Sequence, residues 1–254
     1  AFNNKDVKTK ITFLNYWKIK NNNKLVSGLF TLRDREGNLI NRIYEKEFNY
    51  TYTYDLFNVL KKNKIKNNFL GTIECEFYSI KDLKFSFPAL QVFYETKDGV
   101  GCVHTNQRIF NNIEDLFENK PLNDFQTGFD INVSNKLDSF LTFINGPVTL
   151  KDRTLKLNFF NSKGKKLSKK IPYKIIKPYE VKYLSLTDTF SDLKDFFDNQ
   201  TGYCKVLSTS ENVFNRIMVG NITKNSRKIS VTHSYYDCSS TKDYIDENTI
   251  PSDE

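Results

Sequence analysis

The chain contains two histidines, His104 and His233, and each closes a short β-like stretch, "GCVH" and "SVTH". A neutral imidazole can bind a metal ion, carry a proton or hydrogen-bond a sugar. Cys102 lies two positions before His104, so on a strand the two side chains would share one face and could hold a metal together. Val231 occupies the corresponding place before His233, so this pair is not repeated. We therefore predict no metal site and no cofactor.

Further polar and aromatic groups surround both histidines. A hydroxyl follows each one, Arg108 lies near the first, and "SYYD" follows the second. The first interpretation of these histidines is structural: each ends a strand and hydrogen-bonds a neighbouring loop. Contact with a ligand or partner is the second interpretation. On that interpretation the candidate binding residues are His104, Arg108, His233, Tyr235, Tyr236 and Asp237.

Familiar catalytic motifs are absent from the sequence. It contains no G-x-S-x-G, H-E-x-x-H, P-loop or G-x-G-x-x-G pattern. A Ser-His-acid triad cannot be located from spacing, because its members meet only in the folded chain. We assign no catalytic residue and favour a non-enzymatic binding or structural module. The alternative is a polysaccharide-acting or other hydrolytic enzyme that uses His233 with the nearby tyrosines and Asp237.

The elements that would position these residues occur twice. "SGLFTLRDREGNLINRIYEKEF" (27–48) aligns with "LKLNFFNSKGKKLSKKIPYKI" (155–175), with Gly37 over Gly164. Both segments are typical of a hairpin, with a strand, a polar turn closed by glycine and a second strand. The leading segments "KTKITFLNYWKI" (8–19) and "NKLDSFLTFI" (135–144) also match as strands. The two histidines are 129 positions apart, close to the offset of the other matches.

Each copy contains about seven short runs of β-branched and aromatic residues separated by turn residues, which is typical of an immunoglobulin-like β-sandwich. In "TIECEF", Ile73, Cys75 and Phe77 share one face and are expected to lie in the core. The spacing in "DLFNVLKKN" (55–63) and "FSDLKDFF" (190–197) predicts a short helical turn in each copy. The predicted fold is mainly β, with two tandem immunoglobulin-like β-sandwich domains that arose by internal duplication.

The predicted domain bounds follow from this alignment. The first β-sandwich repeat takes residues 1–108 and the second takes 131–240. Residues 109–130 carry apolar side chains and are predicted to form a packed linker. Residues 241–254 form an acidic tail.

Tyrosines and cysteines leave alternatives open. Tyr50, Tyr52 and Tyr54 alternate with threonine and so share a strand face, which either packs against the domain or stacks on a sugar or partner.

The four cysteines divide evenly between the halves and form no C-x-x-C motif. They are consistent with one disulfide in each half or with four free buried thiols. The cysteines are Cys75, Cys102, Cys204 and Cys238.

The net charge of +8 does not by itself indicate nucleic-acid binding. The 31 lysines far outnumber the 7 arginines, whereas base recognition favours arginine, and the excess is divided evenly between the halves. No apolar run is long enough to cross a bilayer, so we predict no membrane span. The expected partner is a protein, including further copies of the chain, or a carbohydrate. We expect the module to work at a cell surface or in an extracellular or particle assembly.

Overall fold

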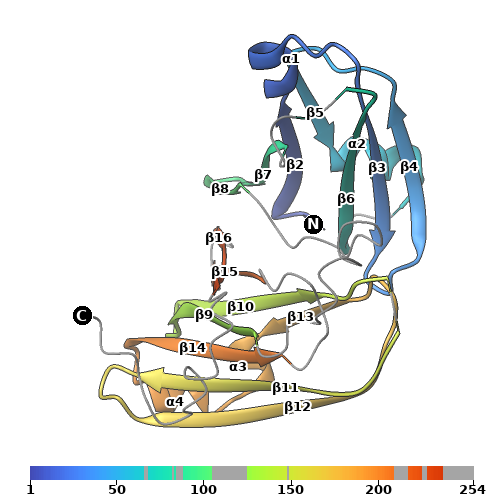
Figure 1. Ribbon diagram of the computed structural model, residues 1–254. Coiled ribbons are helices and arrows are strands. Elements are labelled where there is room, and N and C mark those ends of the chain that lie inside the picture. The colour runs from blue at the N-terminus through green and yellow to red at the C-terminus, as the bar shows by residue number, and fades with distance from the viewer. Residues whose placement is uncertain are drawn as a thin grey trace.

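The computed structural model describes residues 1–65, 68–81, 83, 88–104, 125–147, 149–208, 217–224 and 228–236. Within these residues the protein is mainly β, as the sequence predicted, and has seventeen strands and four short helices. We refer to residues 1–104 as the first half and to residues 125–236 as the second half. Figure 1 shows the two halves one above the other.

All strand pairs in the first half are antiparallel and belong to one eight-stranded sheet. Its order is β4-β3-β6-β1-β2-β7-β8, and β5 pairs with β2 beside this path. The elements are β1 (Phe2–Asn3), β2 (Val7–Leu14), α1 (Tyr16–Asn21), β3 (Val26–Asp34), β4 (Leu39–Glu45), β5 (Thr51–Asp55), α2 (Leu56–Lys62), β6 (Phe69–Ser79), β7 (Ala89–Thr96) and β8 (Gly99–Val103).

The second half forms two antiparallel sheets. One has the order β13-β10-β15-β16 and the other β12-β11-β14-β9-β17. The elements are β9 (Phe125–Asn132), β10 (Leu137–Ile144), β11 (Leu150–Asn161), β12 (Lys166–Ile176), β13 (Val181–Ser185), α3 (Leu186–Thr189), α4 (Leu193–Phe197), β14 (Thr201–Ser208), β15 (Met218–Thr223), β16 (Ile229–His233) and β17 (Tyr235–Tyr236).

Strand partners recur in the two halves in the same chain order. In the first half β2 pairs with β5 and β7, β3 pairs with β4 and β6, and β7 pairs with β8. In the second half β10 pairs with β13 and β15, β11 pairs with β12 and β14, and β15 pairs with β16. The register matches at one internal position, because Phe30 lies opposite Cys75 and Phe159 lies opposite Cys204.

The two glycines aligned in the sequence occupy similar turns. Gly37 closes the β3–β4 hairpin with φ of 87° and donates its N–H to the Asp34 carbonyl at 3.1 Å. Gly164 closes the β11–β12 hairpin with φ of 71° and donates to the Asn161 carbonyl at 2.9 Å. Glycine suits both positions because a side chain is strained at positive φ.

The predicted leading strand 8–19 is wrong in its second part. Strand β2 ends at Leu14, and helix α1 begins at Tyr16. Asn15 ends the strand because its side chain accepts a hydrogen bond from the backbone N–H of Lys18, which caps the helix. The predicted helical turn in 55–63 is confirmed as α2, capped in the same way by Asp55.

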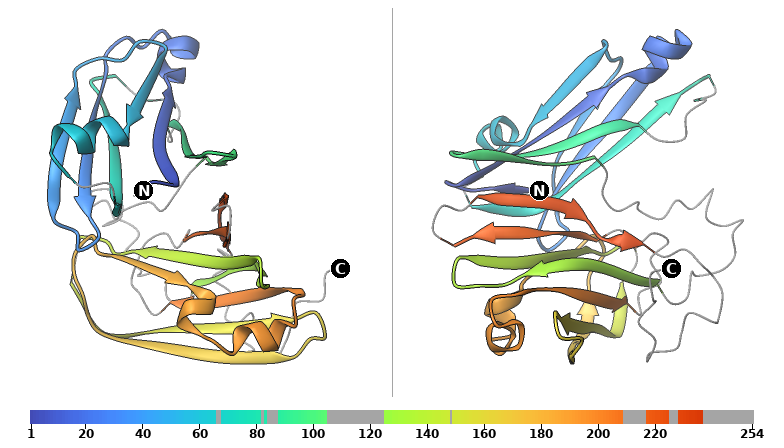
Figure 2. Two further views of the ribbon diagram at one scale, coloured as in Figure 1. Left: turned by 180° about the vertical axis from the view of Figure 1, so that it is seen from behind. Right: turned by 90° about the vertical axis from the view of Figure 1, so that its left-hand side faces the viewer.

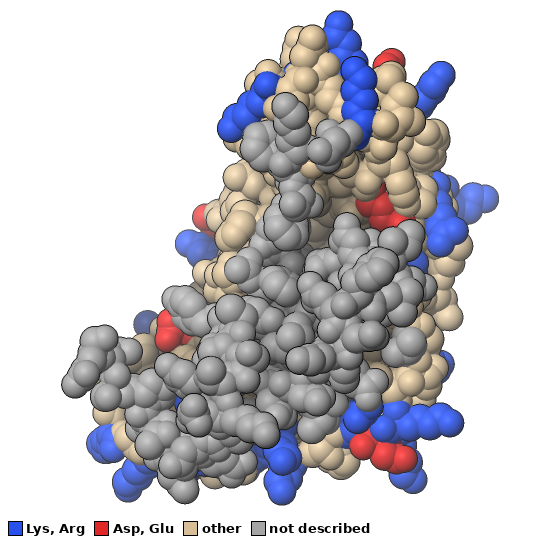
Figure 3. Space-filling model, viewed as in Figure 1, with Lys and Arg blue, Asp and Glu red and all other residues tan. Residues whose placement is uncertain are grey.

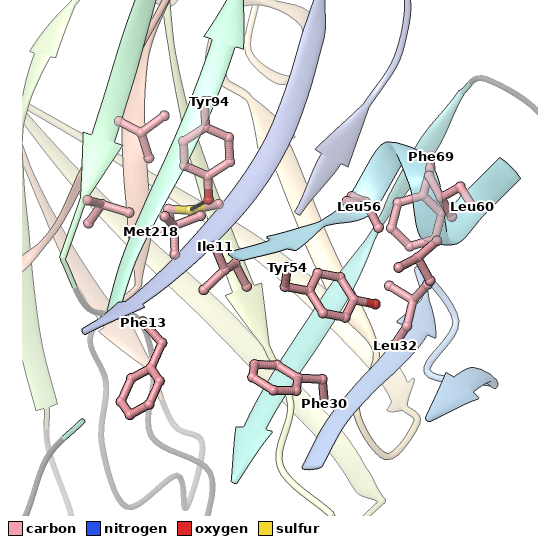
Figure 4. Packing of buried hydrophobic residues seen from close by; sticks show 14 of the residues in the cluster. Ile11, Phe13, Phe30, Leu32, Tyr54, Leu56, Leu60, Phe69, Tyr94 and Met218 are labelled. Atoms are coloured by element: carbon pink, nitrogen blue, oxygen red, sulfur yellow. Dashed lines mark hydrogen bonds between the residues drawn. The ribbon is translucent and has the colours of Figure 1, made fainter. Parts of the chain in front are cut away.

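Aromatic packing dominates the first hydrophobic cluster, which Figure 4 shows from close by. Tyr52 and Tyr54 stack on Phe30 with ring centroids 5.0 and 5.5 Å apart, so these two tyrosines take the packed side of β5. Tyr50, just before the strand, is exposed. Ile73, Cys75 and Phe77 pack against this cluster from β6 and are partly buried.

Strand β10 is buried on both faces. Strand β10 alternates between two environments: Leu141 and Phe143 belong to the second hydrophobic cluster, whereas Phe140 belongs to the first. Met218 of β15 and Val231 of β16 also join the first cluster. The two views in Figure 2 show β15 and β16 between the first-half strands and the rest of the second half. The first cluster is therefore shared by both halves.

A second contact between the halves lies at the tip of the β3–β4 hairpin. The Arg33 guanidinium lies 3.9 Å from the ring centroid of Tyr179 and 2.6 Å from the Glu74 carboxylate. The backbone N–H of Val181 donates to the Arg35 carbonyl at 2.9 Å. These contacts fix the hairpin against the connection between β12 and β13.

Three other predictions meet the structure as follows. The predicted linker 109–130 lies outside the described residues as far as 124, and its last part forms the start of β9. The acidic tail 241–254 lies outside them entirely. None of the described helices has the length and apolar character that crossing a membrane requires.

Candidate functional site

The two histidines meet at the junction between the halves. His104 directly follows β8, and His233 is the last residue of β16. Their ring centroids are 5.1 Å apart, and the ring planes are inclined at 74°. Residues 129 positions apart in the sequence are therefore in direct contact, and we call them the histidine pair.

A glycine allows the strands that carry the histidine pair to approach each other. A Cβ atom on Gly101 of β8 would lie 2.9 Å from the carbonyl oxygen of Ile229 in β16. Real Cβ atoms essentially never come so close to backbone, so a side chain at this position would force β8 and β16 apart. Gly101 thus sets the spacing on which the contact between the imidazoles depends.

The orientation of His233 is fixed by a hydrogen bond to its neighbour. Its Nδ1 lies 3.0 Å from the carbonyl oxygen of Ser234. Because a carbonyl only accepts, the neutral form of this ring has its hydrogen on Nδ1 and its lone pair on Nε2. Ser234 is fully buried, and its own N–H donates to the Ile217 carbonyl at 2.9 Å. In a Ser-His-acid triad a carboxylate would accept the Nδ1 hydrogen, and here a peptide carbonyl accepts it.

The remaining candidate binding residues are only partly placed. Tyr235 and Tyr236 form β17, whose backbone pairs with Gly128 and Thr127 of β9. Arg108 and Asp237 lie outside the described residues. Of the six candidates, the structure places His104 and His233 in contact with each other. A binding role for the six residues stays a prediction.

The first half has two free cysteines and no disulfide between them. Cys75 and Cys102 are both unpaired, as is Cys204 in the second half, while Cys238 lies outside the described residues. Burial, together with the Glu74 and Glu76 carboxylates, raises the pKa of Cys75 to about 12. Burial also raises the pKa of Cys204. Cys102 is the exposed thiol of the three.

The described residues contain no group of three or more His, Cys, Asp or Glu side chains that could hold a metal ion. Cys102 therefore does not complete a three-residue site with the histidine pair, although it precedes His104 by two positions. The metal-binding groups that the described chain brings together at this junction are the two imidazoles.

A second feature, which the sequence analysis did not identify, is an exposed apolar surface at the α1 end of the first half. Six of the ten exposed large hydrophobic residues in the described chain lie there. Hydrogen bonds join the segments that carry them, from the N–H of Asn15 to the Tyr50 carbonyl at 2.9 Å and from Asn23 to Ser79 at 3.0 Å. We call this surface the apical patch; its residues are Tyr16, Ile19, Leu25, Tyr50, Tyr78 and Ile80.

Lysines surround the apical patch. The Nζ of Lys18 lies 5.2 Å from the ring centroid of Tyr50, and that of Lys20 lies 4.6 Å from the ring of Tyr16. Three further exposed lysines and one exposed acidic residue lie in the same segments: Lys24, Lys46, Lys81 and Glu47. Figure 3 shows basic side chains at this end of the molecule. The patch therefore combines apolar surface with a net positive charge.

Sequence signals for these two features were weak. Asn15 is a residue type that favours the start of a helix. It begins α1, so Tyr16 and Ile19 lie exposed on a helix and not on the predicted strand. The contact between the histidines had no local signal, because it depends on how β8 packs against β16.

Comparison with known proteins adds no relative. No protein-family model matches the chain, and no curated protein matches it significantly.

Proposed function

We propose that the chain is a non-enzymatic binding module made of two immunoglobulin-like β-sandwich units related by internal duplication. The recurring strand partners support the duplication, as do the two positive-φ glycine turns. The matched register of Phe30 with Cys75 and of Phe159 with Cys204 supports it further. Duplication of such a unit multiplies contact surfaces without requiring a catalytic centre.

The apical patch carries the functional part of this proposal. Its partner is a protein surface that offers apolar side chains and carboxylates, at a cell surface or in an extracellular or particle assembly. Clustered exposed apolar side chains mark interaction sites, and tyrosine is enriched at the centres of protein interfaces. Lysines around the patch favour an acidic partner and would speed its encounter with the module. A carbohydrate ligand, which tyrosines can also stack on, is the competing outcome.

Peptide display tests this assignment without knowledge of the natural partner. A random peptide library is selected on the intact chain, and we expect the enriched peptides to combine acidic with aromatic or aliphatic residues. Binding of these peptides should fall at least about tenfold in an Ile19→Ser, Tyr50→Ser variant, because each buried apolar anchor contributes on the order of 1–2 kcal/mol.

A matched control removes equally exposed apolar side chains elsewhere. Leu39→Ser, Ile175→Ser alters the exposed residues of β4 and β12, which lie away from the apical patch. This variant should bind the selected peptides as the wild type does. Equal binding by the patch variant and the wild type would refute the proposal, as would glycan binding that depends on the patch in the absence of peptide binding. Sedimentation across concentration shows whether a second copy of the chain is itself the partner.

A further inference from the structure

We propose that His104 and His233 form a two-imidazole site for a divalent transition-metal ion of the zinc class, which links the two halves of the chain. The site is independent of the proposed function, because it lies at the β8–β16 junction and includes no residue of the apical patch.

The spacing of the rings fits a shared metal ion. In tetrahedral sites a histidine nitrogen lies about 2.0–2.1 Å from zinc, so each ring centroid lies about 3.2 Å from the ion and two centroids about 5.2 Å apart. The observed separation is 5.1 Å. Neighbouring ligands on a tetrahedral ion can differ widely in ring orientation, so the 74° inclination is compatible with this arrangement.

The hydrogen bonding of His233 suits a metal ligand. Metal-binding histidines generally donate their second ring N–H to a carboxylate or a backbone carbonyl, which fixes the tautomer and the ring. The Nδ1 of His233 lies in position to donate in this way to the Ser234 carbonyl, and Ser234 is itself held by the Ile217 carbonyl. In the neutral ring this arrangement leaves the lone pair on Nε2. Water would complete the coordination, as two protein ligands leave positions open.

The backbone supports the site from both sides. Paired strands β7–β8 and β15–β16 carry the two histidines, with Val103 opposite Val92 and His233 opposite Met218. Between them Gly101 lets the strands approach more closely than any side chain would allow. Gly101 is thus a positioning residue, since it contributes no ligand but sets the distance between the two that do.

Because the chain has two histidines in total, NMR of histidine-labelled protein reports on the site directly. Zinc chloride is titrated into the intact chain in a Cys102→Ser, Cys238→Ser background, so that neither the exposed Cys102 thiol nor Cys238 competes for the ion. We expect the signals of both imidazoles to shift together and to saturate at one zinc per chain. Movement of neither imidazole, or of one alone, would overturn the proposal, and this readout needs no histidine variant to fold.

Calorimetry and thermal unfolding of variants give the second test. His104→Gln and His233→Gln should each weaken zinc binding at least about tenfold, as even the loss of a supporting hydrogen bond to a ligand costs that much. Gly101→Ala keeps both imidazoles and should also weaken binding, whereas Gly99→Ala, where a Cβ meets nothing within 4 Å, should not. Zinc should raise the melting temperature of the wild type and of Gly99→Ala, but not that of the histidine variants or of Gly101→Ala. Unchanged affinity in the double histidine variant would refute the site.

Discussion

Two glycines in equivalent turns offer a controlled test of how the halves contact each other. Gly37 and Gly164 both have positive φ, but their surroundings differ. A Cβ on Gly37 would lie 2.2 Å from the carbonyl oxygen of Pro178, with backbone atoms of Tyr179 and Glu180 also within 3.2 Å. A Cβ on Gly164 would meet nothing within 4 Å. Alanine therefore introduces the same backbone strain at both sites but a collision at one.

The expected losses of stability follow from the backbone strain and from the collision. A side chain in the left-handed region costs about 1–2 kcal/mol, and loss of freedom in the unfolded chain offsets about 0.4–1 kcal/mol. Gly164→Ala should therefore lower the free energy of unfolding by about 1 kcal/mol. Gly37→Ala adds an overpacking cost of about 1–3 kcal/mol, because the hairpin must move away from backbone that cannot yield.

Guanidinium-induced unfolding measures the difference in the free energy of unfolding between the two variants. The slope m is compared at the same time. For a chain of this size each kcal/mol corresponds to about 2–4 °C in melting temperature, so thermal scans provide a second estimate. Gly37→Ala should unfold at the lower denaturant concentration with m unchanged. Equal losses in the two variants, within about 0.5 kcal/mol, would show that the hairpin does not rest on residues 178–180 in solution.

Two further predictions concern named side chains. A double-mutant cycle between Arg33→Lys and Tyr179→Leu should give a coupling energy of about 0.5–2 kcal/mol, because the lysine ammonium lacks the planar guanidinium that stacks on the Tyr179 ring. Additive effects of the two substitutions would contradict the contact. In native protein at pH 8, Cys102 should react with iodoacetamide at least about tenfold faster than Cys75 or Cys204, whose thiols are held protonated by burial. Peptide mapping by mass spectrometry checks this order, and rapid labelling of Cys204 would contradict the burial of β14.

Local patterns in the sequence were sufficient where one element decides the structure. Alternation along "TIECEF" placed Ile73, Cys75 and Phe77 toward the first cluster, since side chains in a strand point to opposite faces in turn. The apolar spacing after Asp55 predicted α2, and a polar turn ending in glycine predicted both hairpins. The mainly β fold is confirmed on this basis, while the immunoglobulin-like sandwiches and the duplication stay predictions.

The helical turn predicted in 190–197 is confirmed as α4, whereas α1 and α3 were not predicted. The segment 190–197 contains α4, but α4 begins only at Leu193, and α3 precedes it at Leu186–Thr189. Trp17 and Ile19 continue the alternation of Ile11 and Phe13 in the sequence, yet the cap at Asn15 begins a helix there. The error in 8–19 arises because a short apolar run fits a strand and a helix turn equally well.

Contacts between the halves were beyond the reach of the sequence. The histidine pair and the Arg33–Tyr179 contact each join residues more than 100 positions apart, on elements whose own patterns give no partner. The predicted repeat implies that His104 and His233 are equivalent. Equivalence within two copies does not imply contact between them, because contact depends on which face of one copy covers the other.

The burial of β10 on both faces limits how this protein can vary. Every residue from Asp138 to Phe143 is buried, and even the Asp138 carboxylate is engaged, by the Ser185 hydroxyl and the Thr187 N–H. A strand on the surface of a sandwich can change every second residue without consequence. In β10 no such alternate set is free, so natural variants of this protein should accumulate changes in β12, with its alternating exposed residues, long before they accumulate them in β10.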